Sequence, residues 1–265
     1  MPPSAIALIL SGTVFHVAWN GLLKERPSPR PLGAALFVVG VAGSALALFL
    51  GERVPVVAVV FLVATVAIHA LYFTGLGKAY GSGDLSSAYP VARGLGVALL
   101  PFLVLAAAGP ALGVLGWAGI ALVATGSVVE GASRDARTYI VPTIGVGVLI
   151  ALYSFIDKGG VTVMSPLLYE SLTFVGAGGI LVVGNPLSDL RLGRASVLVA
   201  LLSLASYLLT LLAFRLGPVA PLLAIRQVAI PMALLWALLR RERVHGRRLV
   251  ASLLVLVGAV AVGLG

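Results

Sequence analysis

Ten apolar segments follow one another along the chain, and their length constrains the fold more than any other feature. Each is long enough to cross a hydrocarbon layer of roughly 30 Å as a helix. Because lipid offers no partners for backbone groups, each segment must form its own hydrogen bonds, and we predict an all-α membrane protein with ten transmembrane helices. The predicted spans are Ser4–Leu23, Leu32–Leu50, Val54–Gly77, Leu85–Ala108, Leu112–Val129, Tyr139–Ile156, Pro166–Val183, Ser196–Phe214, Pro218–Leu239 and Arg248–Leu264.

The overall composition agrees with a membrane protein and excludes several other classes. Hydrophobic residues make up 60% of the 265 positions and charged residues 10%. In a soluble domain about half of the residues are apolar and about a quarter are charged. The net charge of +9 does not indicate a nucleic-acid partner, because the basic residues lie in short gaps and form no stripe with interleaved aromatics. The absence of cysteine excludes disulfides and thiolate metal sites. We therefore expect a multi-pass protein of the cell membrane, embedded in the lipid bilayer.

The second half of the sequence repeats the first. Arg93 and Arg226 lie 133 positions apart, and Tyr72 and Tyr207 lie 135 positions apart. A near-constant offset across five segments indicates a duplication. Since five is an odd number of crossings, the second copy must be inverted relative to the first. We predict two inverted five-helix repeats.

The two predicted repeats cover residues 1–131 and 132–265, and the basic residues of their loops bear on the orientation of the chain. Loops after odd-numbered spans, counted with Arg248 at the start of the tenth span, hold 13 Lys and Arg residues, and loops after even-numbered spans hold 3. By the positive-inside rule the odd loops are cytoplasmic and both termini lie outside. A fused pair of repeats removes the need to dimerise, so we expect a monomer.

A polar stretch inside the fourth apolar segment is the main candidate for a functional site. Arg93 lies about two turns into this segment, where a charge without partner or water costs about 3 kcal/mol. Tyr89 and Pro90 share its helical face, and Pro90 leaves one backbone carbonyl without its helical donor. Arg226 occupies the equivalent place in the second half. Two buried guanidinium groups favour a carboxylate or phosphate ligand, and the alternative is that each binds carbonyls, a tyrosine or a carboxylate as a structural strut.

Polar and aromatic side chains on other spans are candidates to line a binding site. His16, Trp19 and Asn20 form one stripe on the first span. They either line a cavity, with His16 able to take a proton near neutral pH, or hydrogen-bond a neighbouring helix. A lone histidine within a helix, such as His69, is more often a packing residue. The aromatic candidates are Tyr72 on the third span, Tyr153 on the sixth and Tyr207 on the eighth.

Two acidic residues near predicted helix ends allow more than one interpretation. Glu170 lies one turn after Ser165–Pro166, a pair typical of an N-cap followed by proline at the first helical position. Glu170 is therefore either a proton-coupling carboxyl or an acid at the positive end of a helix. Asp157 and Lys158 follow the predicted sixth span, and we interpret them as a local charge pair at the membrane surface.

Several stretches of the chain resemble one known family. They are HVAWNGLLK at His16–Lys24, KAYGSGDLSSAYPVARG at Lys78–Gly94, LGWAGIALVATG at Leu115–Gly126, YSFIDKGG at Tyr153–Gly160 and the ending Arg240–Gly265. In this order, and with the duplication, they resemble the drug/metabolite transporter superfamily in its ten-helix EamA-like branch, over nearly the whole chain. The resemblance implies ten helices around a central cavity and export or exchange of small metabolites, often amino acids. It also implies cytoplasmic termini, opposite to the loop charges, and both orientations stay open.

Inverted repeats with polar, proline-interrupted helices are typical of secondary transporters. We expect a secondary active transporter that exports a small polar metabolite, such as an amino acid or organic anion, by alternating access. The alternatives are an intramembrane enzyme acting on a lipid or peptide, and a passive channel. No HExxH or GxSxG motif or paired catalytic constellation is present, so we expect no enzyme activity, catalytic residue, metal or cofactor. The predicted substrate-binding residues are Trp19, Asn20, Tyr72, Tyr89, Arg93, Tyr153, Tyr207 and Arg226, and the candidate proton carriers are His16 and Glu170.

Overall fold

The computed structural model describes residues 1–23, 29–81, 85–131, 140–184, 193–239, 241 and 244–265, and this part of the chain contains helices and no strand. The long elements of the first half are α1 (Pro3–Leu23), α2 (Pro29–Phe49), α3 (Ala58–Gly81), α4 (Leu85–Ala106) and α5 (Val114–Gly131). The second half contains α6 (Ile140–Val163), α7 (Pro166–Val183), α8 (Arg194–Leu216), α9 (Val219–Ile225), the 3₁₀ segment η3 (Arg226–Val228), α10 (Ala229–Leu239) and α11 (Gly246–Leu264).

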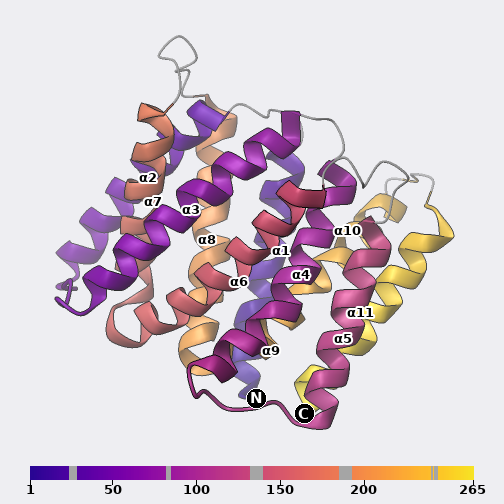
Figure 1. Cartoon of the computed structure of the whole chain (residues 1–265). Helices are drawn as coiled ribbons and strands as arrows, with labels where there is room; N and C mark the ends of the chain where they lie inside the picture. Colours follow the sequence, from indigo (N-terminus) through magenta and orange to yellow (C-terminus); the bar gives the residue numbers. More distant parts are fainter. Residues whose placement is uncertain (24–28, 82–84, 132–139, 185–192, 240, 242–243) are drawn as a thin grey trace.

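The helices have the length and polarity of membrane spans. Nine helical stretches among the described residues are long and apolar enough to cross a membrane, and Pro90–Ala106 is a shorter apolar helix. Both termini lie at the same end of the bundle (Figure 1). For the described residues, the prediction of an all-α, multi-pass membrane protein is therefore confirmed.

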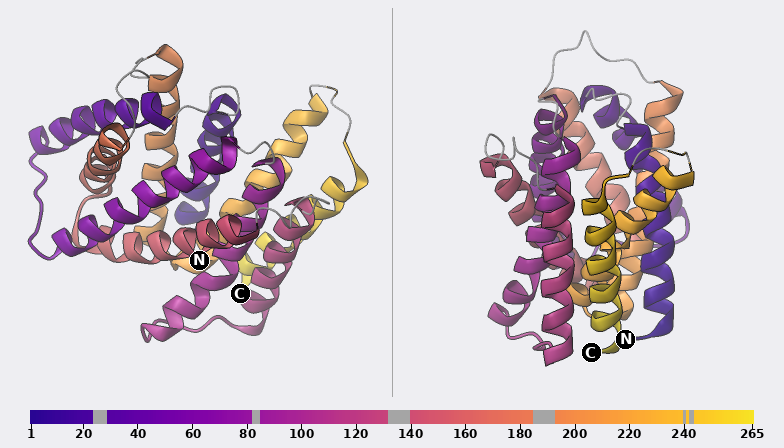
Figure 2. Two further views of the ribbon diagram at one scale, coloured as in Figure 1. Left: turned by 45° about the horizontal axis from the view of Figure 1, so that its top comes forward. Right: turned by 90° about the vertical axis from the view of Figure 1, so that its right-hand side faces the viewer.

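The helices pack in pairs that join the two halves of the sequence. α2 packs against α7, α1 against α8, and α5 against α11, while α6 contacts both α3 and α4. Figure 1 shows α2, α3 and α7 on one side of the bundle, α5 and α11 on the other, and α1, α4, α6 and α8 between them. The right-hand view of Figure 2 shows α5 and α11 side by side at the front. The buried polar side chains described below lie on these central helices, on α3 and α7, and on η3.

The ninth predicted span is interrupted. α9 ends at Ile225, η3 covers Arg226–Val228, and α10 begins at Ala229. Pro231 provides a physical reason, because proline has no amide hydrogen to donate to the carbonyl four residues earlier, at Gln227. A short 3₁₀ turn inside an otherwise α-helical span places Arg226 and Gln227 at the break.

The sixth span is longer than the sequence predicts. Its predicted end was Ile156, but α6 continues to Val163. The added turns carry Asp157 and Lys158 inside the helix rather than after it. The following helix begins as predicted, since the Ser165 hydroxyl accepts a hydrogen bond from the Leu168 amide at 3.3 Å and Pro166 occupies the first turn.

Glycine permits the closest helix contacts. A Cβ atom built on Gly258 of α11 would lie 2.7 Å from the Gly119 carbonyl oxygen of α5. A Cβ atom on Gly12 of α1 would lie 2.8 Å from the Ser206 carbonyl oxygen of α8. Small residues let membrane helices approach in this way because packing, and not burial from water, holds them together.

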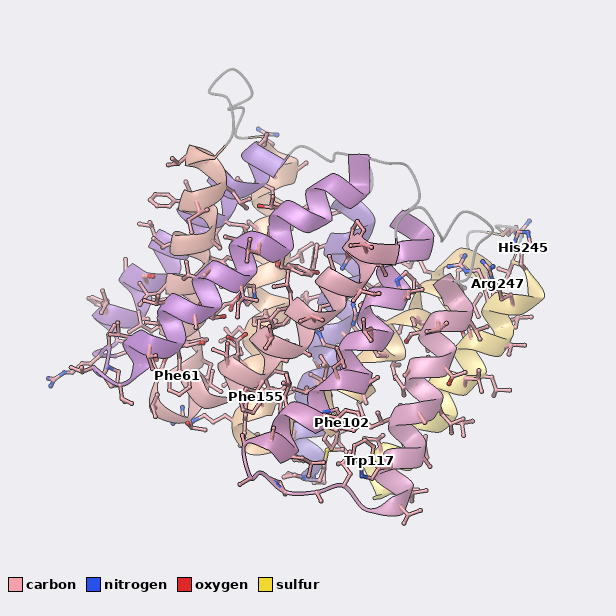
Figure 3. The ribbon with its side chains drawn as sticks, in the orientation of Figure 1. Phe61, Phe102, Trp117, Phe155, His245 and Arg247 are labelled. Atoms are coloured by element: carbon pink, nitrogen blue, oxygen red, sulfur yellow. The ribbon has the colours of Figure 1, made fainter. Side chains whose placement is uncertain are left out.

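Large apolar side chains cover much of the outer surface of the bundle. Large apolar side chains such as Phe102 are more than half exposed, as a lipid-facing surface requires. Figure 3 shows Phe102 and Trp117 near the end that carries the termini, and His245 and Arg247 at the opposite end of the bundle. The Phe102 and Trp117 rings contact each other at a centroid distance of 5.2 Å. Aromatic residues near span ends are typical of membrane–water interfaces.

Candidate functional site

Buried polar side chains gather in two neighbouring clusters among the central helices. We call the first the arginine cluster, formed by His16, Asn20, Arg93, Ser206, Arg226 and Gln227. We call the second the aspartate cluster, formed by Thr65, His69, Asp157, Tyr169 and Tyr207. Except for Asn20, which is partly buried, each of these side chains is less than a tenth exposed. The structure thus concentrates in one region groups that are costly to place in an apolar bundle.

His16 is the centre of the arginine cluster. Arg93 from α4 contacts its Nε2 atom through Nη1, and Arg226 from η3 lies with Nη2 3.4 Å from its Nδ1 atom. Asn20, one turn along α1, places its amide nitrogen 3.1 Å from the same Nε2 atom and donates to the His16 carbonyl at 2.8 Å. Both ring nitrogens therefore face nitrogen donors, and the two guanidinium groups approach one imidazole from different helices.

The side chains of Gln227 and Ser206 orient the two arginines. Arg93 Nε donates to the side-chain oxygen of Gln227 at 2.8 Å, and Gln227 donates to the Leu223 carbonyl at 3.2 Å. Arg226 Nη2 donates to the Ser206 hydroxyl at 3.3 Å. Adjacent residues of η3 thus serve two roles: Arg226 adds a second cation, and Gln227 positions the first.

The Ser206 hydroxyl also joins the cluster to the closest contact between α1 and α8. It donates to the Gly12 carbonyl oxygen at 2.8 Å. Because a side chain at Gly12 would collide with the Ser206 backbone, glycine at this position allows α8 to reach His16 one turn further along α1. The packing of α1 on α8 and the geometry of the arginine cluster are therefore set by the same residues.

Two guanidinium groups gathered on one imidazole favour an anion. Positive charges in an apolar environment repel strongly, and a carboxylate, phosphate or sulfonate would relieve that repulsion. Arginine binds such groups through paired N–H donors in a planar fork. The arrangement is therefore suited to bind an anionic group of a ligand.

Asp157 is the centre of the aspartate cluster. It is fully buried, and its carboxylate accepts three hydrogen bonds from hydroxyl groups. Thr65 donates to Oδ1 at 2.6 Å, and Tyr169 donates to the same oxygen at 2.9 Å. Tyr207 donates to Oδ2 at 2.5 Å. These donors come from α3, α7 and α8, so one carboxylate on α6 connects four helices.

Glu170 is a second buried carboxyl next to this cluster. It is 1% exposed, and neither of its side-chain oxygens has a hydrogen-bond partner among the described residues. It interacts electrostatically with Asp157 and with Arg226. Glu170 is thus a buried acid close to another buried acid, and the choice between a proton-coupling carboxyl and an acid at the positive end of a helix stays a prediction.

Tyr207 connects the two clusters. Its hydroxyl binds Asp157, and the Arg226 guanidinium carbon lies 5.3 Å from the centre of its ring. A cation over a tyrosine face at this distance is attracted by the ring. Tyr153 and His69 pack beside Tyr207, with ring centroids 5.9 Å and 5.7 Å away. The two clusters are thus one side chain apart.

Most of the predicted site residues come together. Trp19 packs its ring against His16 at 5.1 Å, and Tyr72 packs against Tyr153 at 5.7 Å. Tyr89 lies on α4, but its side chain falls outside the described residues. The remaining predicted residues belong to, or border, the two clusters: His16, Asn20, Arg93, Tyr153, Glu170, Tyr207 and Arg226.

The interpretation of Asp157 and Lys158 as a surface charge pair is wrong. Asp157 is buried with its three hydroxyl partners, while Lys158 donates to the Phe214 carbonyl at 2.5 Å and the Gly217 carbonyl at 3.2 Å. The two side chains point to different partners because α6 continues past them. Lys158 stabilises the C-terminal end of α8, where carbonyl groups lack helical donors.

Sequence reasoning did not identify Thr65 and Gln227 as site residues. Thr65 lies four residues before His69, and its hydroxyl is 3.0 Å from His69 Nδ1. The helical spacing of these two polar residues was a signal, but hydroxyl groups on membrane helices commonly bond their own backbone. Gln227 directly follows Arg226, and only the 3₁₀ turn brings it to Arg93.

Fold and buried clusters together define a multi-pass α-helical membrane protein with a charged interior. No family model and no curated protein matches the sequence. Fourteen chains of solved structures match the fold. One of them, described only as "Crystal structure of protein", superposes on 100% of this chain and 99% of its own with a TM-score of 0.71 and 20% sequence identity. At that identity the likeness concerns the fold alone.

Proposed function

We propose that this protein is a secondary transporter that moves a small polar metabolite with an anionic group across the membrane by alternating access. It is an EamA-like member of the drug/metabolite transporter superfamily, with ten transmembrane helices in two inverted five-helix repeats. The single observation that carries the proposal is the meeting of Arg93 and Arg226 at His16, inside a bundle of mainly apolar helices.

The pairing of helices supports the inverted repeat. The proposed repeat makes α1 equivalent to α6 and α3 equivalent to α8. The contact of α1 with α8 should therefore recur as a contact of α6 with α3, and these two helices also pack together. The repeat also makes α4 equivalent to the interrupted ninth span. The contact of α4 with α6 should then recur between the ninth span and α1, and these are also in contact. The pairs α2 with α7 and α5 with α11 map onto themselves. A bundle made of two unrelated halves has no reason to keep this pattern.

The interrupted ninth span supports a transporter over other membrane proteins. Transporters commonly bind substrate where a spanning helix is broken near the middle of the membrane, because the break exposes backbone and side-chain groups to the ligand. Here the break supplies Arg226, and Gln227 at the same turn holds Arg93. Each of the two proposed repeats thus contributes one arginine.

The burial of the arginine cluster fits alternating access. Arg93 is 7% exposed and Arg226 is 5% exposed, so a ligand reaches them only after helices move apart. A passive channel would instead need a continuous water-filled path. An intramembrane acid enzyme would need carboxyls that reach its substrate, whereas Asp157 and Glu170 are both buried and both oxygens of Asp157 accept hydrogen bonds from the protein.

Ligand-dependent thermal stabilisation of the purified protein tests the proposal. The panel contains amino acids, organic carboxylates, phosphonates and cationic drugs. A ligand that binds only the folded state raises its stability by about 2.7 kcal/mol at a hundred times its dissociation constant. We expect an anionic compound to raise the melting temperature of the wild type, and the increase to be lost in Arg93→Ala.

Three further variants separate binding from folding. Arg215→Ala removes an exposed arginine at the last turn of α8 and should leave the stabilisation intact. Arg93→Lys keeps the charge but loses the fork, so binding should weaken and not vanish. Gln227→Glu adds a negative charge beside Arg93 Nε and should compete with an anionic ligand. If cations alone stabilise the wild type, the arginine-centred site is refuted.

A further inference from the structure

We propose that Asp157 binds a proton that is transported together with the anion, and that its charge controls the affinity of the arginine cluster. This inference rests on the proposed transport function, because it assigns the coupling ion and its carrier. It follows from the contacts of Asp157, the buried acid beside it and the position of Tyr207.

The contacts of Asp157 suit reversible protonation. All three partners are hydroxyl groups that donate to it, so the observed network stabilises the ionised form. Oδ2 receives only the Tyr207 hydroxyl. A proton bound to Oδ2 forms an O–H bond there, neutralises the carboxylate, and turns this oxygen into a donor toward Tyr207. The Tyr207 proton must then point elsewhere, so this side chain responds directly to the protonation state.

No basic side chain in the described part of the chain forms an ion pair with Asp157. The ion pair found there joins Arg248 to Glu130, at another place in the bundle. When a carboxylate in an ion pair takes up a proton, the cation that was its partner is left as an uncompensated buried charge. A carboxylate bound only by hydroxyl groups has no such partner, so its protonation simply removes one buried charge. This is the difference between a proton site and a structural salt bridge.

Other titratable and charged groups around Asp157 define the compartment. His69 faces it from α3, Tyr169 and Glu170 from α7, and Tyr207 from α8. On α6 itself, Tyr153 lies one turn earlier and Lys158 is engaged with α8. Arg226 lies on the far side of Tyr207.

The two buried acids are not equivalent in this compartment. Like charges in one buried space repel, which favours a single negative charge on the Asp157 and Glu170 pair. The three donors place that charge on Asp157, because Glu170 has no hydrogen-bond partner among the described residues. We therefore assign the transported proton to Asp157 and not to Glu170.

His16 is a poor carrier for the same proton. Its two nitrogens face Arg93, Arg226 and Asn20. A proton added to the ring would place a third positive charge against two guanidinium groups. The geometry therefore makes His16 part of the anion site and leaves proton binding to the aspartate cluster.

The charge of Asp157 acts on the arginine cluster across Tyr207. The hydroxyl hydrogen bond of 2.5 Å and the 5.3 Å from the ring centre to the guanidinium carbon place Arg226 no more than roughly 10 Å from Asp157. At that distance a negative charge weakens the binding of an anion by about tenfold for an effective dielectric constant of about 20. Protonation of Asp157 removes the charge and raises the affinity for the anion again by the same factor. By linkage, a bound anion raises the affinity of Asp157 for the proton by an equal factor. Proton and anion therefore bind together and move in the same direction.

The experiment measures the affinity of the purified full chain for inorganic sulfate between about pH 6 and pH 9, where sulfate keeps its charge. Because sulfate carries two negative charges, we expect the wild type to bind it at least about tenfold more tightly at the acidic end. Asp157→Asn should bind with the tight affinity at every pH. Glu170→Gln and Glu130→Gln should keep the wild-type pH dependence, the second because its carboxyl belongs to the distant ion pair.

Infrared difference spectra between acidic and alkaline buffer supply an independent readout. The carbonyl band of a protonated carboxyl should appear on acidification of the wild type and be reduced in Asp157→Asn. A wild type with pH-independent sulfate affinity overturns the coupling without any variant, and a pH dependence lost in Glu170→Gln overturns the assignment to Asp157. If the band is present but sulfate does not bind at any pH, the anion site of the proposed function fails, and the coupling with it.

Discussion

The packing of α4 on α6 allows a sharp test with two glycines on one helix. Gly147 and Gly145 lie two residues apart on α6. A Cβ atom at Gly147 would lie 2.8 Å from the Ala92 carbonyl oxygen and 2.9 Å from the Leu95 Cβ atom of α4. A Cβ atom at Gly145 would have no neighbour within 4 Å. Alanine at the two positions therefore differs only in what the new methyl group meets.

The expected difference follows from these distances. Carbon atoms in ordinary contact are about 3.5–4.0 Å apart, so α4 and α6 must separate by about 0.6 Å or more to accept Gly147→Ala. Overpacking of this kind costs about 1–3 kcal/mol. Both variants gain the same helix preference of alanine over glycine, about 0.5–1 kcal/mol, and this gain cancels in the comparison. Gly147→Ala should thus be about 1–3 kcal/mol less stable than Gly145→Ala.

Thermal unfolding in one detergent measures this difference. For a protein of about this size, 1 kcal/mol corresponds to about 2–4 °C, so Gly147→Ala should melt about 2–12 °C below Gly145→Ala. Gly145→Ala should melt at or slightly above the wild type. Equal melting temperatures for the two variants would refute the close approach of α4 and α6 at Ala92, and with it the placement of Arg93.

Two other predictions concern the ends of helices. Ser165→Ala removes the hydroxyl that accepts from the Leu168 amide and that bonds Glu52, and should cost about 1 kcal/mol in thermal or denaturant unfolding, while Ser165→Thr should recover most of it. A threonine variant as unstable as the alanine variant would contradict this N-cap. The Arg248 and Glu130 pair, 2.9 Å apart with the arginine side chain 33% exposed, should show a coupling of less than about 1 kcal/mol in a double-mutant cycle, decreasing with salt. A coupling of several kcal/mol that salt does not change would contradict its partial exposure.

The fold class followed from the sequence because apolar length is a strong local signal. A run such as Pro166–Val183 has few alternatives to a membrane helix, and α7 has those bounds in the structure. The ends of α6 and the break between α9 and α10 were not predicted. Charged residues at the end of an apolar run usually mark the membrane surface, whereas Asp157 lies inside because three other helices supply donors. Local patterns carry no information on such distant partners.

The candidate site, too, was predicted only in part from the sequence. Arg93 and Arg226 stood out because a charge inside an apolar run requires an explanation, and their matching offset tied them together before their contact with His16 was known. Gln227 and Thr65 did not stand out, because amide and hydroxyl groups are tolerated in membrane helices and their importance lies in what they bind. The sequence marks a costly residue but does not name its partner.

Tyr207 shows why the partner decides the role. Its match with Tyr72 across the repeat indicated a pair of equivalent residues, yet the two differ in what surrounds them. Tyr72 packs among aromatic rings, while Tyr207 joins a buried carboxylate to a guanidinium group. Asp157 on α6 is what makes the difference, because it provides the acceptor for the Tyr207 hydroxyl. In the proposed inverted repeat, one acid thus makes the interior asymmetric, and in the proposed transporter this asymmetry allows proton and substrate to occupy different sites while each senses the other.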